Sequence, residues 1–195
     1  MAATGGYDTI RIAFAAALLA LQDTDTGEPY FKFRPGTEWT YVHTADGKSS
    51  RAVLTVTKEQ DGRVHVETKS YRADPEKPAV HEQVWYVEDG HVVWAAVREK
   101  QVEPQVRIYK IGSCKGDTWK DLAQSDTKSA VATHHGTEEV TVPAGTFKSA
   151  TKVQVRVDRS ALTLWLVPDV GMVRLETTDG VKTATSELKE FKPGK

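Results

Sequence analysis

Apolar and polar residues alternate along most of the chain from residue 28 onward. The clearest example is residues 152–158, where every second residue is a valine. A period of two is typical of a strand with one buried and one exposed face. The residues expected on the buried face are Val153, Val155 and Val157, and those expected on the exposed face are Lys152, Gln154 and Arg156.

Asp-Gly pairs separate several of these alternating segments. Both residues tolerate the positive φ that a tight hairpin turn requires, so each pair predicts a hairpin. The pairs are Asp46-Gly47, Asp61-Gly62, Asp89-Gly90 and Asp179-Gly180. No segment after residue 22 keeps a helical period for three turns. The pattern therefore predicts one all-β domain over residues 28–190, with roughly ten to twelve antiparallel strands and little helix.

Three segments break the alternation because they are apolar on both faces, namely residues 83–87, 91–97 and 162–167. An open antiparallel sheet leaves one face in water, whereas these strands require cover on both sides. We therefore expect a single antiparallel sheet curled into a barrel or half-barrel. Residues 71–81, which contain two prolines and several charges, are expected to form an exposed loop, and residues 191–195 are expected to fray.

The five tryptophans divide into two groups. Trp39 and Trp119 each follow a glycine in a Gly-x-x-Trp segment and are expected in the core. Trp85, Trp94 and Trp165 lie in the strands that are apolar on both faces. Aromatic rings on the concave side of a curled sheet suit a pocket for an apolar or amphiphilic ligand, so these three are the predicted ligand-binding residues. The alternative is that their rings fill the interior.

Several motifs in a fixed order resemble a broad group of bacterial envelope proteins of unassigned function. They are the Gly-x-x-Trp start in residues 33–41, the V-P-A-G-T-F turn at residues 142–147 and the G-x-V segment at residues 171–173. The resemblance covers residues 30 to about 190 and implies a fold similar to the half-barrel of Lol-type lipoprotein carriers. The helices that plug the carrier half-barrel are not evident in this sequence.

Composition narrows the function classes. The chain has 195 residues, of which 27% are charged, and a formal net charge of -1. This size suits one domain, and the balanced charge argues against a nucleic-acid surface. A lone cysteine, Cys114, excludes an internal disulfide and a multi-cysteine metal cluster. His43 and His65 lie in alternating segments at positions that we expect to face outward.

His134, His135 and Glu138 are the strongest candidates for chemistry. Imidazole and carboxylate groups bind zinc or copper, so a metal-dependent enzyme is one alternative. Neighbouring residues of a strand point to opposite faces, so the two histidines can share an ion only if Gly136 turns the chain. The sequence has no nucleophile elbow, zinc-protease motif or nucleotide-binding loop. We therefore expect no enzymatic activity, no cofactor and no bound metal.

Residues 1–22 are predicted to be a signal peptide. Arg11 precedes an apolar block at residues 12–21, which is too short for a membrane span of about 20 residues but suits the core of a secretory signal. A short amphipathic helix packed on the domain is the alternative. We expect a periplasmic or secreted protein with no stable membrane span. Its expected partner is an apolar ligand or an envelope protein, which an exposed edge strand could pair with.

The leader generates a direct prediction. In a bacterial host, the mature chain should begin between Leu21 and Asp25, because the polar residues that follow the apolar block mark the end of a signal peptide. Mass spectrometry of the native protein measures this terminus. Recovery of the intact N-terminus from the cytosol would contradict export.

Overall fold

A computed structural model describes residues 30–31, 33–71, 76–98, 101–120 and 130–195. The predicted signal peptide lies outside these residues. Every regular element of the described part is a β-strand, which confirms the all-β prediction. No helix within these ranges has the length and apolarity to cross a membrane.

The strands belong to one antiparallel 12-stranded sheet. In chain order they are β1 (Glu38–Ala45), β2 (Lys48–Gln60), β3 (Arg63–Tyr71), β4 (Ala79–Glu88), β5 (His91–Arg98), β6 (Gln101–Lys110), β7 (Thr118–Lys120), β8 (Val131–Val142), β9 (Gly145–Val157), β10 (Ser160–Val167), β11 (Gly171–Thr178) and β12 (Thr183–Lys192). The expected loop at residues 71–81 is shorter than predicted, because its first residue ends β3 and its last three begin β4.

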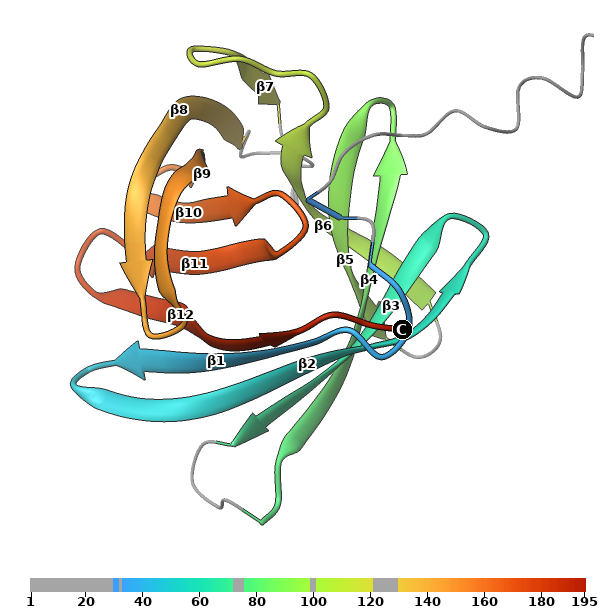
Figure 1. Cartoon of the computed structure of the whole chain (residues 1–195). Helices are drawn as coiled ribbons and strands as arrows, with labels where there is room; N and C mark the ends of the chain where they lie inside the picture. Colours follow the sequence, from blue (N-terminus) through green and yellow to red (C-terminus); the bar gives the residue numbers. More distant parts are fainter. Residues whose placement is uncertain (1–29, 32, 72–75, 99–100, 121–129) are drawn as a thin grey trace, which may run out of the picture.

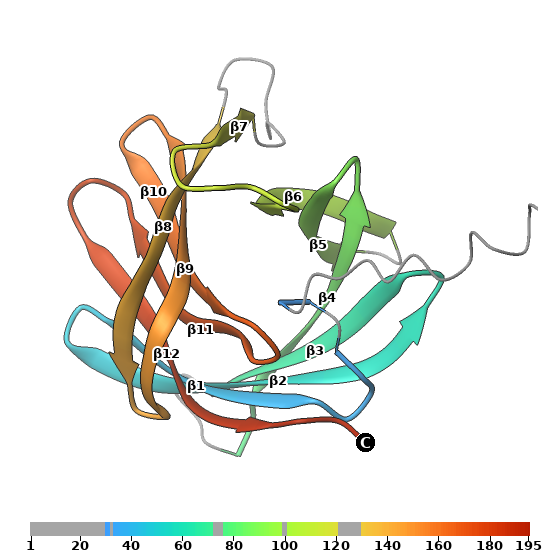
Figure 2. The ribbon, with the colours of Figure 1, turned by 45° about the horizontal axis from the view of Figure 1, so that its top comes forward.

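Each strand pairs with its neighbour in the chain, except that β1 pairs with β12 and β6 does not pair with β7. The strands β1–β6 and β7–β12 therefore form two meanders joined through their first and last members. The sheet curls until β6 and β7, its two edges, face each other (Figures 1 and 2). The result is a barrel that is almost closed, with one seam between β6 and β7.

The Asp-Gly hairpins follow from backbone conformation. In the turns after β1, β2 and β4, both residues have positive φ. The three aspartates have φ of 50°, 52° and 49°, and the three glycines have φ of 71°, 70° and 71°. This is the geometry of a two-residue type I′ turn, whose twist matches that of the flanking strands. The fourth pair lies in a longer turn, where only Gly180 has positive φ and the Asp179 carboxylate accepts two backbone N–H groups at 2.8 Å.

The two Gly-x-x-Trp segments are built alike. The N–H of Gly36 donates to the carbonyl of Val56 at 2.8 Å, and the Val56 N–H donates back to the residue after the glycine at 2.9 Å. In the second segment, the N–H of Gly116 donates to the carbonyl of His134 at 2.8 Å. The N–H of His134 donates back to the residue after that glycine at 2.9 Å. The glycines have φ of 84° and 97°, which glycine adopts without strain. Each segment thus opens one six-strand half, at β1 and at β7.

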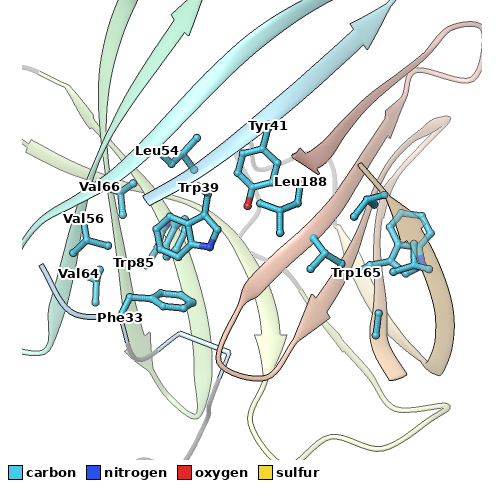
Figure 3. Close-up of a cluster of buried hydrophobic side chains, with 14 residues drawn as sticks. Phe33, Trp39, Tyr41, Leu54, Val56, Val64, Val66, Trp85, Trp165 and Leu188 are labelled. Atoms are coloured by element: carbon cyan, nitrogen blue, oxygen red, sulfur yellow. The ribbon is translucent and has the colours of Figure 1, made fainter. Parts of the chain in front are cut away.

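Aromatic residues that precede β1 fill one end of the barrel. The ring of Phe33 packs edge-on against Trp39, with centroids 4.6 Å apart, and lies 6.0 Å from Trp85. Phe31 packs edge-on against Trp85 at 6.2 Å. Figure 3 shows Phe33, Trp39 and Trp85 together. Room for Phe33 comes from Gly171, where a Cβ atom would approach the Phe33 ring to 2.7 Å.

Side chains bridge the seam between β6 and β7. The indole N–H of Trp119 on β7 donates to the carbonyl of Arg107 on β6 at 3.1 Å. Tyr109 on β6 packs edge-on against His134 on β8, with ring centroids 6.2 Å apart. Tyr30 adds a second edge-on contact to Tyr109 at 5.3 Å. The barrel is therefore closed here by side chains in place of a strand ladder.

The alternation expected in residues 152–158 is confirmed for Val153, Val155 and Arg156. Lys152 and Gln154 were predicted to be exposed but are half-buried. The Lys152 ammonium lies 5.1 Å from the centre of the Trp165 ring, and Gln154 donates to the Thr163 hydroxyl at 3.2 Å. Neighbouring strands therefore cover part of the outer face. The side chain of Val157 lies outside the described residues.

The prediction that residues 191–195 fray is wrong. Phe191 belongs to β12 and lies 6.0 Å from the Trp39 ring. The N–H of Gly194 donates to the Thr37 hydroxyl at 3.0 Å. The pairing of β12 with β1 brings these distant residues together, so the tail packs on the start of the domain.

Replacement of Gly171 by alanine should destabilise the fold more than replacement of Gly36. Their φ values, 86° and 84°, are nearly equal, so both variants lose roughly 1–2 kcal/mol through the left-handed backbone. Only the Gly171 Cβ meets a ring, which should cost a further ~1–3 kcal/mol of unfolding free energy. Chemical denaturation of both variants measures the difference. Equal losses would show that Phe33 moves aside without cost.

Candidate binding cavity

The interior between the two halves of the barrel contains a cavity of about 350 Å³. This volume is at the lower end of the ~300–1,000 Å³ typical of small-molecule sites. Its apolar lining includes Phe31, Trp85, Trp94, Ile108, Leu166 and Met172. Its polar lining includes His43, Ser50, Thr68, Ser70, Gln83 and Ser186. The cavity is therefore amphiphilic.

Polar and apolar groups are separated along the strands. On β1, the inward-facing residues run from polar His43 at one end to apolar Trp39 at the other. On β2, the residues directly opposite them are polar Ser50 and apolar Leu54. On β3, Ser70 is opposite Ala52 and Thr68 is opposite Leu54. His43, Ser50 and Ser70 are half-buried, whereas Trp39, Leu54 and Thr68 are buried. We call the polar end, formed by His43, Ser50, Ser70 and Ser186, the mouth. We call the apolar end, formed by Phe31, Trp85, Trp94, Leu166 and Met172, the floor.

His43 is at the centre of the mouth. Ser50 on β2 and Ser186 on β12 are its direct cross-strand neighbours. Its Nδ1 atom lies 3.1 Å from the Ser186 hydroxyl oxygen. Deeper in the cavity, the Gln83 amide donates to the Thr68 hydroxyl at 2.5 Å. The mouth thus offers an imidazole between two hydroxyls.

No aspartate, glutamate or lysine appears among the described residues that line the cavity. Arg51 contacts the cavity, but its guanidinium lies over the ring of Tyr71, 4.2 Å from the ring centre. These two residues are cross-strand neighbours on the outer face of the sheet, because Ser50 and Ala52 on either side of Arg51 face inward. The described lining of the cavity therefore carries no acidic charge.

Buried polar groups of the wall are satisfied by the protein. The Tyr41 hydroxyl donates to the carbonyl of Met172 at 2.6 Å, and burial raises the pKa of this phenol far above its usual range. The Trp39 indole N–H donates to the carbonyl of Val170 at 2.7 Å. These bonds tie β1 to the start of β11 across the interior and leave both side chains neutral.

The structure brings Trp85 and Trp94 to the cavity, where they are cross-strand neighbours on β4 and β5. It does not bring Trp165 there. Leu164 faces the cavity, and the ladder is regular from Leu164 to the next residue, which therefore points to the other side of β10. The Trp165 indole N–H donates to the Glu138 carboxylate at 2.7 Å on that side. Figure 3 shows Trp165 well apart from Trp85.

The environment of Trp165 is charged. The guanidinium of Arg174 and the ammonium of Lys152 lie 5.0 and 5.1 Å from its ring centre. The Trp165 hydrogen bond, followed by Lys152, holds the pKa of the Glu138 carboxyl below its usual value. Trp165 therefore organises an ion cluster on the outer face.

The candidate metal ligands are not brought together. His134 is buried, with Nδ1 3.1 Å from the Ser113 hydroxyl, whereas His135 is exposed. A bulge at this point includes Gly136 with φ of 91°, yet the two imidazoles remain in different environments. Glu138 binds Trp165, as described above. The described residues contain no group of three or more histidine, cysteine, aspartate or glutamate side chains placed to hold a metal ion.

The sequence interpretation missed two parts of the site. His43 was predicted to face outward and faces the mouth instead. Its position could have been found, because Trp39, Tyr41 and His43 are at every second position and must share a face. Phe31 on the floor lies in no strand and has no periodic signal. His65 is on the outer face, as predicted, and contacts Glu82 at 2.9 Å.

Comparisons with known proteins relate the fold to that of a bacterial protein of known structure. No protein-family model and no curated protein sequence matches the chain. A Bacteroides fragilis protein described as exported, with a YmcC-like fold, is 19% identical, with a TM-score of 0.54, over 84% of this chain and 98% of that one. The chain shares this fold. The structure of the Pseudomonas aeruginosa MucA/MucB complex is 15% identical, with a TM-score of 0.45, over 87% of this chain and 54% of that one.

Replacement of Trp165 by phenylalanine should raise the pKa of Glu138 toward its ordinary value, because the largest cause of its lowering is the indole hydrogen bond. The lowered pKa means that ionised Glu138 favours the folded state at neutral pH, and this contribution disappears as pH falls through that pKa. Carbon-13 NMR titration of the carboxyl group measures the shift. A Lys152→Met variant should also raise the pKa, because Lys152 lowers it through a hydrogen bond and its charge. An unchanged pKa in Trp165→Phe would contradict the assignment.

Proposed function

We propose that this protein is an extracytoplasmic, non-catalytic binding protein that encloses the apolar chain of an amphiphilic molecule. The observation that supports this function best is the cavity itself. Its floor is apolar, with Trp85 and Leu166 buried, and its mouth is polar and half-buried. An amphiphile bound with its chain on the floor and its head group at the mouth would match both ends.

Burial of an alkyl chain supplies the binding energy in this proposal. Each methylene transferred from water to an apolar surface contributes ~0.8 kcal/mol, which corresponds to roughly fourfold in affinity. Affinity should therefore rise with chain length until the cavity is full. Trp85 and Trp94 contribute large apolar surfaces to this contact.

The mouth supports binding better than hydrolysis. His43 and Ser186 lie at a distance suitable for a base and a nucleophile. A Ser-His site also needs a group that orients the imidazole, usually a carboxylate. The described lining offers none. The extracytoplasmic location is supported by the predicted leader and by the exported protein from Bacteroides fragilis that shares the fold.

Quenching of tryptophan emission tests the proposal. A dodecyl alcohol with a terminal bromine places the quencher at the floor without a charged head group. We expect saturable quenching at micromolar concentrations. A Trp94→Phe variant should lose part of this quenching, whereas Trp165→Phe should retain all of it, because Trp165 lies outside the cavity. Equal losses in both variants, or no quenching in the native protein, would contradict the proposed site.

A variant that fills the cavity provides a second test. Ala52 faces the cavity and Val53 does not. Ala52→Phe should weaken binding of the dodecyl alcohol at least tenfold, while Val53→Phe should leave it unchanged. Thermal unfolding confirms that both variants fold. Unchanged binding in a folded Ala52→Phe variant would place the ligand elsewhere.

A further inference from the structure

The charge pattern at the mouth indicates which amphiphiles the cavity selects. We infer that it prefers single-chain amphiphiles with an anionic head group, carboxylate or phosphate, contacted by His43. This inference rests on the proposed binding function. It adds the class of ligand and the residue that recognises its head group.

The lining favours a negative head group over a positive one. It offers an imidazole and several hydroxyls but, in its described part, no acidic side chain. A cationic head group that left water at this mouth would find no countercharge, which is costly. An anionic head group would accept hydrogen bonds from Ser50, Ser186 and His43. Such bonds are stronger when one partner is charged.

The geometry places His43 where a head group would lie. It is flanked by Ser50 and Ser186 on the two neighbouring strands. Its Nδ1 atom is within hydrogen-bonding distance of the Ser186 hydroxyl, so Nε2 is left to contact a ligand. The chain of the same ligand would continue past Tyr41 and Ala52, the next inward-facing pair, toward the floor.

The other charged groups near His43 lie on the outer face. Arg51 follows Ser50 and lies over Tyr71. Glu187 follows Ser186 and is 3.8 Å from Arg174. Tyr41 remains neutral. Among the described lining residues, His43 is therefore the group at the mouth whose ring nitrogen can donate a hydrogen bond to an anionic head group.

A head-group series with one chain length tests the inference. Dissociation constants are measured at pH 7 for dodecanol, dodecanoate, dodecyl phosphate and dodecyltrimethylammonium, below their micellar concentrations. We expect at least one anionic probe to bind tenfold or more tightly than the cationic probe. The carboxylate and phosphate arms show which anion fits. His43→Gln should reduce this preference about tenfold.

His65 supplies the matched control, because it is a histidine on the outer face of the same sheet. His65→Gln should bind all four probes like the native protein. Equal affinity for all four probes, or a preference that survives in His43→Gln, would overturn the inference and leave the proposed function intact. Failure of every probe to bind, dodecanol included, would overturn both.

Discussion

The cavity depends on the packing of a short aromatic segment against the inside of the barrel. Phe33 lies between Trp39 and Trp85, over a glycine that makes room for its ring. Phe31 extends this cluster toward the interior. Together these rings fill one end of the barrel with protein. At the other end, where β1 and β2 carry His43 and Ser50, the described residues include no such aromatic cluster, and they enclose the cavity.

Strand register converts this packing into a site with two chemically different ends. Because β1 and β2 are paired in register, His43 lies beside Ser50 at the mouth and Trp39 lies beside Leu54 deeper in the barrel. On β3, Ser70 is opposite Ala52 and Thr68 is opposite Leu54. A shift of one residue in any of these strands would turn its inner face outward. The type I′ turns after β1 and β2 hold this register.

The sequence predicted the fold better than the site. Alternation and Asp-Gly turns are local signals, and strands that are apolar on both faces require a curled sheet, so the all-β barrel could be predicted. The pairing of β1 with β12 leaves no local signal, which explains the error at Phe191 and Gly194. Trp165 was grouped with Trp85 by strand composition, although counting from Leu164 places it on the other face.

The pairing of β1 with β12 also determines the order in which the barrel can form. The strands β1–β6 are hairpin neighbours and can pair as soon as each is synthesised. The pairing of β1 with β12, from Glu38–Lys192 to Ala45–Ala184, must wait until almost the whole chain is available. Contacts of such long sequence separation form slowly. During synthesis, one edge of β1 therefore stays unpaired until β12 appears, and such an edge can pair with other chains.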